Sequence, residues 1–298
     1  MEAFLQPPEE GASAAASGVT RDPTADKAVI LLKDGSEVRR WRIRPPRPPA
    51  APKPPKVEEP QLRAALVSGS ALGDLLLSPT VREARDKAFR LAIAAGHTRE
   101  EAEMAAMVAG DAIAANFDLD AALAAGRSMA TLLSEGYNYN EAMAGAHAAA
   151  VATSNGYSPA AADAAADATA RALHAGHAPD AVKAAVKAAI AATEAGFSKE
   201  AAQAGGDAAA NAIATGGSEL AAEVAGEAAA NAIMDGHSYE AAMAAGHAAG
   251  SAIMGGYDRD TALMAGQASA QAIDDGRSWD EAMAAGKAVC EAMVSGCR

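Results

Sequence analysis

The sequence is poor in cysteine, in aromatic residues and in large apolar side chains. Its 298 residues contain only two cysteines, Cys290 and Cys297, and 4% aromatic residues. Two cysteines close to one end do not make the disulfide framework of a small secreted domain, and they suit a reducing compartment. The apolar half of the chain is mostly alanine, so the core must be built from many close contacts between small side chains.

Long apolar runs and positive charge are also scarce. No stretch of about 18 apolar residues is free of charged residues or histidine, which excludes a predicted membrane span. The opening MEAFLQPPEEG lacks the apolar core of a secretory signal. Residues 61–298 carry fifteen Lys/Arg against twenty-nine Asp/Glu, a net charge near −14, which disfavours nucleic acid as a partner. We therefore expect a soluble, intracellular protein.

What the sequence does have is a glycine every twenty residues. The series, broken only by Asn116, consists of Gly96, Gly136, Gly156, Gly176, Gly196, Gly216, Gly236, Gly256, Gly276 and Gly296. Glycine and asparagine are the preferred residues just after a helix C-terminus. Two positions later a good N-cap follows in nearly every unit, namely Thr98, Asp118, Asn138, Ser158, Ser198, Ser218, Ser238, Asp258 and Ser278. Each unit is thus predicted to be one helix of about 16 residues, antiparallel to the next.

The residues within a unit predict its faces when the glycine is counted as position 0. Position 11 forms a polar column, and positions 4, 7, 15 and 18 are also often polar, so this stripe is expected to face water. Position 17 is usually Ile or Leu and is expected to anchor neighbouring helices. At position 10 glycine recurs, which predicts close approach of helix backbones, at Gly126, Gly206, Gly226, Gly246, Gly266 and Gly286. The fold class predicted is all-α, a solenoid-like array of Ala/Gly-rich single-helix repeats.

The two ends of the array are predicted to differ. Residues 61–95 are interpreted as N-terminal capping helices, because Arg85 and Asp86 replace the small residues of the regular units that fill 96–298. The last unit has no polar cap, and its candidate partner contacts are Trp279, Met283, Cys290 and Met293. Its outer face is either covered by a second copy or another protein, or is an alanine-rich surface that tolerates water.

The first sixty residues follow another pattern. Residues 27–43 are predicted to form a β-hairpin with its turn at Asp34-Gly35, after a disordered tail at 1–26. Residues 44–60 are a proline-rich linker. Arg42, Pro45 and Pro48 have the R-x-x-P-x-x-P spacing that suits an SH3-type groove, so this stretch is either a ligand or only a linker.

No catalytic, cofactor-binding or metal-binding constellation emerges from the sequence. The six histidines lack the further ligands that a zinc site needs, even where His174 and His177 lie near each other in sequence. Tyr139, Tyr239 and Trp279 share position 3 of their units. They either form an aromatic row for a partner or shield the neighbouring turn.

These features predict a non-enzymatic scaffold or linker protein that needs no cofactor. It would bind partner proteins, or a second copy of itself, along the helical surface and at the C-terminal end. An ice-binding or surface-adsorbing protein is the alternative, because regular alanine-rich helices resemble some antifreeze proteins. The threonines of this chain, however, do not share one register.

Overall fold

The computed structural model describes residues 19–20, 27–31, 37–42 and 78–296, and the chain divides into two units, Met1–Ser68 and Gly69–Arg298. In the first unit, strands β1 (Val19–Thr20), β2 (Lys27–Leu31) and β3 (Glu37–Arg42) form an antiparallel sheet in that order. Ala28 lies opposite Trp41 in the pairing of β2 with β3, which is the predicted hairpin. β1 was not predicted. The linker at 44–60, with Pro45 and Pro48, lies outside the described residues, as does most of the tail at 1–26.

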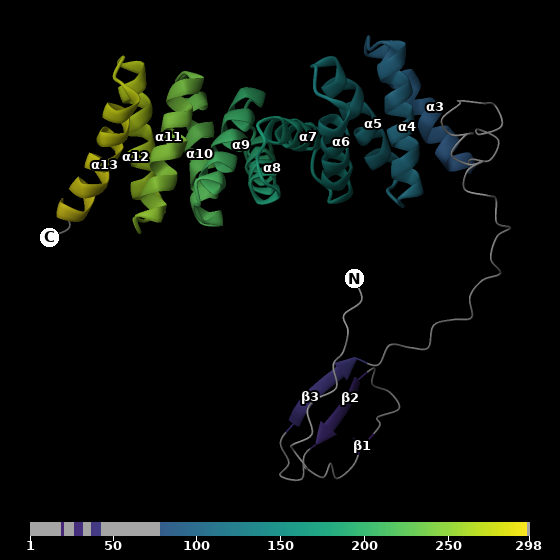
Figure 1. Ribbon diagram of the computed structural model, residues 1–298, viewed down its shortest axis with the longest axis horizontal. Helices are drawn as coiled ribbons and strands as arrows, with labels where there is room; N and C mark the ends of the chain where they lie inside the picture. The colour runs from purple at the N-terminus through teal and green to yellow at the C-terminus, as the bar shows by residue number, and fades with distance from the viewer. Residues whose placement is uncertain (1–18, 21–26, 32–36, 43–77, 297–298) are drawn as a thin grey trace. The chain divides into compact units, whose positions relative to one another are not determined.

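The second unit is the predicted array, and its described part contains eleven consecutive helices (Figure 1). Every helix except the last has sixteen residues, which confirms the repeat length inferred from the glycine spacing. In chain order the helices are α3 (Pro79–Ala94), α4 (Arg99–Ala114), α5 (Leu119–Ser134), α6 (Tyr139–Ser154), α7 (Pro159–His174), α8 (Pro179–Glu194), α9 (Lys199–Ala214), α10 (Glu219–Met234), α11 (Tyr239–Met254), α12 (Arg259–Asp274) and α13 (Trp279–Gly296).

The recurring glycine ends each helix in the left-handed conformation. Gly96 has a φ of 92°, and its N–H donates to the carbonyl of Ile93 while the N–H of His97 donates to that of Ala92. This Schellman pattern satisfies two carbonyls that the helix leaves open. Asn116 adopts the same conformation with a φ of 69°. Gly296 differs from the prediction, because it is the last residue of α13 and not part of a turn.

The predicted N-caps hold the beginning of each helix. Thr98 and Glu101 exchange the two hydrogen bonds of a capping box, and so do Asn138 and Glu141. Ala178 precedes α8 without a side-chain cap, and Pro179 follows it. Start and stop signals thus explain why a helix forms at every unit and why each has the same length.

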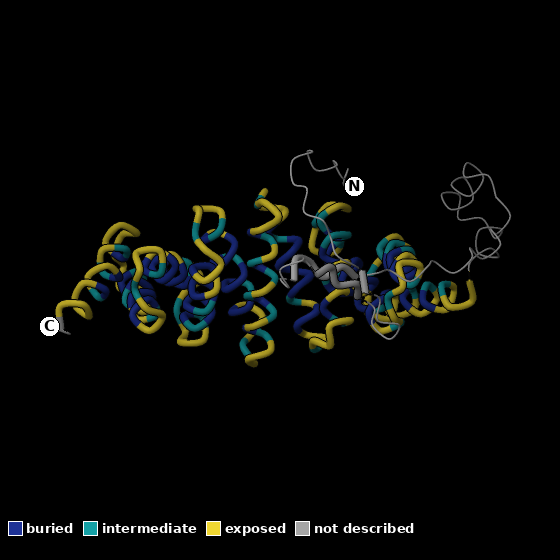
Figure 2. The backbone as a smooth tube through the Cα atoms, turned by 90° about the horizontal axis from the view of Figure 1, so that it is seen from below, coloured by how far each residue is buried: buried dark blue, intermediate teal, exposed yellow. Residues whose placement is uncertain are grey.

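Alternate helices form the two layers of the array. Each helix contacts the next one in the chain, and most contact the next but one, with α6 and α8 making little contact. Buried residues run through the middle of the array, whereas the turns at both edges are exposed (Figure 2). At position 17, Ile213 and Ile233 are half-buried and pack against the alanine core, as expected of an anchor. The array is therefore a two-layer helical solenoid.

Close helix approach at the glycines is confirmed by the space around them. A Cβ added to Gly126 would lie 2.8 Å from the carbonyl oxygen of Ala105 on the preceding helix. Gly266 meets the carbonyl of Ala245 in the same way at 2.9 Å. At the α3 end, a Cβ on Gly110 would meet the Cγ of Arg85 at 2.8 Å. The capping helix therefore uses the aliphatic part of an arginine where regular units use alanine.

Candidate interaction surface

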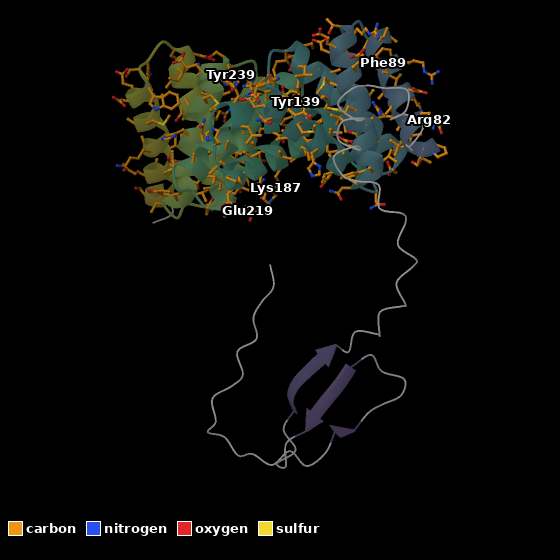
Figure 3. All side chains as sticks on the ribbon, turned by 45° about the vertical axis from the view of Figure 1, so that its right-hand side comes forward. Arg82, Phe89, Tyr139, Lys187, Glu219 and Tyr239 are labelled. Atoms are coloured by element: carbon orange, nitrogen blue, oxygen red, sulfur yellow. The ribbon has the colours of Figure 1, made fainter. Side chains whose placement is uncertain are left out.

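The polar column at position 11 joins helices of the same layer. Several of its members contact residues at position 3 of the unit two further on: Lys187 Nζ lies 3.0 Å from Glu219 Oε1, and the rings of His247 and Trp279 lie 5.9 Å apart between centroids. Figure 3 shows Lys187 and Glu219 next to each other on the array. The sequence predicted this stripe as polar and mostly exposed, but its repeat-to-repeat pairing was missed. The sequence signal for this pairing is a pair of complementary residues 32 positions apart, such as Lys187 and Glu219.

A partly buried network in the polar column connects three helices of one layer. The Asp207 carboxylate on α9 accepts hydrogen bonds from the guanidinium of Arg171 on α7 and from the hydroxyl of Tyr239 on α11. The hydrogen bond with Asp207 raises the pKa of Arg171. Partial burial, followed by the Asp207 hydrogen bond, raises the pKa of Tyr239. Arg171 and Tyr239 are both protonated at neutral pH, and the raised pKa values extend these protonation states to higher pH.

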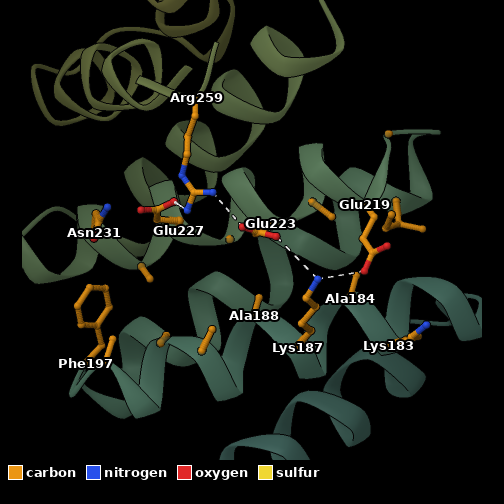
Figure 4. A pocket seen from close by; sticks show the side chains of 18 of the residues that line it. Lys183, Ala184, Lys187, Ala188, Phe197, Glu219, Glu223, Glu227, Asn231 and Arg259 are labelled. Carbon is orange, nitrogen blue, oxygen red and sulfur yellow. Dashed lines mark hydrogen bonds and ion pairs between the residues drawn. The ribbon is translucent and has the colours of Figure 1, made fainter. Parts of the chain in front are cut away.

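A groove of about 710 Å³ lies between α8 and α10, with Arg259 of α12 at its edge (Figure 4). Its lining on α8 runs from Asp180 to Ala195, along the whole length of that helix. The floor is alanine and glycine, and the only large apolar side chains in the lining are Phe197 and Ile213. We call this cavity the α8–α10 groove.

Seven charged residues line the α8–α10 groove, and all but Asp180 and Lys183 form ion pairs with one another. Lys187 Nζ lies 3.0 Å from Glu219 and 3.8 Å from Glu223. Arg259 donates to Glu223 at 2.9 Å and also to Glu227. The hydrogen bond with Glu219 raises the pKa of Lys187, and that with Glu223 raises the pKa of Arg259. The rim is thus largely neutralised, and the apolar floor is the surface left for a ligand.

The sequence of α8 explains why the groove lies here. Val186 and Ile190 stand at positions 10 and 14, where other units mostly have alanine or glycine, and they pack toward the N-terminal part of the core. Ala184 and Ala188 then face α10 and are only half-buried, because alanine is too short to fill the space. The groove was not predicted, although the two large residues in a small-residue register were a signal for it.

A second, smaller pocket of about 350 Å³ lies in the other layer, among α5, α7 and α9. Its polar lining includes Asp167, which is only 8% exposed although its column was expected to face water. Gln203 Nε2 donates to Asp167 Oδ2 at 3.0 Å. Asp167 is buried because α9 places Gln203 over it across the layer. We call this cavity the α5–α9 pocket.

The aromatic residues predicted as a partner row have different surroundings. Tyr239 is 44% exposed and bound to Asp207, and Trp279 is 40% exposed and lies against His247. Tyr139 is 43% exposed, and its hydroxyl makes no hydrogen bond within the described part of the chain. The first two side chains therefore contact the polar column of the helix two units earlier in the chain, and not a neighbouring turn.

The candidate contacts of the last helix are divided between surface and core. Met293 is 42% exposed and Met283 is half-buried. Cys290 is only 2% exposed and is a free thiol in the core, where burial raises its pKa. At the other end of the chain, Arg42 is the last residue of β3.

Nowhere in the described ranges do three His, Cys, Asp or Glu side chains gather in a way that would hold a metal ion. His174 Nδ1 lies 3.2 Å from Glu141 Oε1. None of the described helices combines the length and the apolar character that crossing a bilayer requires.

Comparison with known proteins adds no relative. No protein-family model matches the chain, and neither a curated protein nor a solved structure matches it. Any function must therefore be argued from the surface of the array itself.

Proposed function

We propose that the chain is a non-enzymatic scaffold or linker protein that binds a partner protein along its helical array. The observation that carries this proposal is the α8–α10 groove, an apolar floor as long as a helix between rims whose charges mostly pair. Sixteen residues of α8 span about 24 Å. A groove of that length suits a peptide segment better than a compact metabolite.

The partner segment expected is an amphipathic helix with large apolar side chains. The floor contributes mainly methyl groups, so leucine, isoleucine or phenylalanine from the partner would fill the space that Ala184 and Ala188 leave open. Its polar flanks would meet Glu219, Glu227 and Lys183 at the rim. Helices recognise such grooves through apolar residues three and four apart.

The C-terminal end of the array is a second contact surface in this proposal. On α13, Ala284 and Ala288 are exposed, whereas the residues at the same positions of α11 are buried. Trp279 and Met293 are exposed on the same helix. A partner or a second copy would cover this face as each helix of the array covers the one before it.

No observation favours ice binding over this proposal. The hydroxyls of Thr153 and Thr193 donate to the carbonyls of Ala149 and Ala189 one turn earlier, at 3.0 and 2.9 Å. Thr169 is buried. These threonines therefore do not form a flat exposed row of hydroxyl groups.

Affinity capture from native extract tests the proposal when it is combined with groove variants. The full chain is compared with chains lacking 1–60 or 276–298, with Ala191→Arg in the groove, and with Ala114→Arg on the exposed surface of α4. We expect one stoichiometric partner whose recovery falls at least about tenfold for Ala191→Arg and not for Ala114→Arg. Loss only without 276–298 would assign binding to α13, and no stoichiometric partner at all would contradict the proposal.

A further inference from the structure

The α5–α9 pocket contains one carboxylate that no cation neutralises by direct contact. Five charged residues line the pocket, and four of them form two ion pairs: Arg127 with Asp163 at 2.9 Å, and Lys199 with Glu135 at 3.6 Å. The remaining one is Asp167. A buried carboxylate without a cationic partner is costly, which makes it a place where a bound cation is favoured.

The hydrogen bonds of Asp167 leave room for a further donor. Gln203 Nε2 donates a hydrogen bond to Asp167 Oδ2 at 3.0 Å. Among the described residues, Asp167 Oδ1 accepts no hydrogen bond. Arg171 stands one turn further along α7, but its guanidinium donates to Asp207 and to Tyr239. Its charge lowers the cost of burying Asp167 without filling the remaining acceptor.

A second polar atom in the lining also lacks a partner. Ser128 of α5 is 4% exposed, and its Oγ makes no hydrogen bond with any described residue. Buried hydroxyls in native proteins nearly always find a partner, so an unpartnered one in the wall of a pocket indicates a ligand. Oγ is able to accept from a bound N–H group.

Apart from Thr131 and Thr193, the rest of the lining is apolar. Leu132, Phe197 and several alanines surround the polar groups, in a volume of about 350 Å³. Small-molecule sites commonly have this composition, a mostly apolar wall with a few polar groups that fix orientation.

We propose that the α5–α9 pocket binds an aliphatic ammonium group, with Asp167 as its counter-ion and Ser128 as a second acceptor. The ammonium supplies three donors, and the alkyl chain contacts Leu132 and Phe197. The same chemistry is found in a free alkylamine and in a lysine side chain of a partner protein. This inference does not rest on the proposed function of the α8–α10 groove, although Phe197 lines both cavities.

Titration of the full-length protein with n-butylammonium, followed by NMR at constant ionic strength, tests the pocket. We expect shifts at Ser128 and its neighbours, and at least about tenfold weaker binding of the uncharged n-butanol. Asp167→Asn should weaken butylammonium binding by at least about tenfold, and Ser128→Ala by a smaller factor. The matched control is Glu103→Gln, which removes one carboxylate outside the pocket that is paired with Arg99, and it should change affinity less than about twofold.

Nα-acetyl-lysine methylamide identifies the source of the ammonium. If it binds as well as butylammonium, a partner's lysine fits, and if only butylammonium binds, the site takes free amines. Equal binding of n-butanol and butylammonium by the wild-type protein would overturn the proposal without any variant. An effect of Glu103→Gln equal to that of Asp167→Asn would overturn it as well, because general surface charge would then explain the binding.

Discussion

Gly205 and Gly226 face each other across the contact between α9 and α10. A Cβ on either residue would lie 2.9 Å from the carbonyl oxygen of the other, and one on Gly226 would also lie 2.9 Å from the Cβ of Ala188. The two backbones therefore approach each other as closely as the absence of a side chain permits. This contact explains why helix-weakening glycines stand in the middle of the helices.

The Gly226→Ala substitution is expected to destabilise the array. Its methyl group must displace backbone of α9 and Ala188 of α8, at a cost of about 1–3 kcal/mol in unfolding free energy. Gly250→Ala is the matched control, because its Cβ would meet nothing closer than 3.4 Å, and it should stabilise by up to about 1 kcal/mol. Urea unfolding of both variants measures the difference, and a similar effect of the two would exclude close approach as the cause.

The left-handed conformation at the turns predicts that Gly256→Ala and Asn116→Gly change the unfolding free energy in opposite directions. Gly256 has a φ of 85° and open space around its Cβ position, so Gly256→Ala costs only the backbone penalty of about 1–2 kcal/mol. Asn116 has a φ of 69°, so Asn116→Gly should raise the unfolding free energy by about 0.5–1 kcal/mol. Thermal unfolding of the two variants is the measurement. A loss of stability in Asn116→Gly would show that the asparagine side chain contributes more than its backbone conformation costs.

The missing N-cap of α8 predicts a stabilising substitution. Ser158 precedes Pro159 and accepts a hydrogen bond from the N–H of Ala161 at 3.2 Å, which shows that serine caps a helix beginning with proline in this chain. Ala178→Ser should therefore add about 0.5–1 kcal/mol to the unfolding free energy. Ser158→Ala should remove a similar amount. If both changes leave the urea midpoint unaltered, capping contributes nothing at these turns.

The Asp207 network predicts a dependence of stability on high pH. The pKa of Tyr239 is raised in the folded chain, so the folded state holds this proton after the unfolded state releases it near pH 10. The stabilisation is complete below that pH and is lost as pH rises above it. The unfolding free energy of the wild-type protein should fall more steeply above pH 10 than that of Tyr239→Phe.

Tyr139→Phe is the control for this titration. Tyr139 occupies the same position of its repeat as Tyr239 and is nearly as exposed, but its hydroxyl makes no hydrogen bond among the described residues. Its stability should follow the wild-type curve between pH 8 and pH 11. If the stability of Tyr239→Phe also follows the wild-type curve, the Asp207 network does not cause the loss of stability at high pH.

Local signals were enough to predict the array. Glycine or asparagine at each turn, a capping side chain two residues later and small residues at fixed positions each act within one unit or between adjacent units. The helices, their length and the close contacts at position 10 follow from them. Gly296 is the exception in the series, because it is the last residue of α13.

The candidate binding surfaces could not be predicted in the same way. The pairing of Lys187 with Glu219 and the burial of Asp167 under Gln203 depend on which residues two units apart face each other, and hence on the twist of the whole array. A groove also forms only where the side chains of neighbouring helices are too small to fill the space between them. Val186 distinguishes α8 in the sequence, because most other units have alanine or glycine at position 10. Only the packed structure shows that Ala188 is half-buried beside α10.

Site-specific photo-crosslinking in native extract is the most direct measurement of partner binding in the α8–α10 groove. A photoreactive residue replaces Lys183, which is exposed at the groove, or, as a matched control, Lys87, which is exposed on α3. We predict a single crosslinked protein from position 183, lost when Ala191→Arg is added, and none from position 87. The same products from both positions, or none from position 183, would contradict binding in the groove.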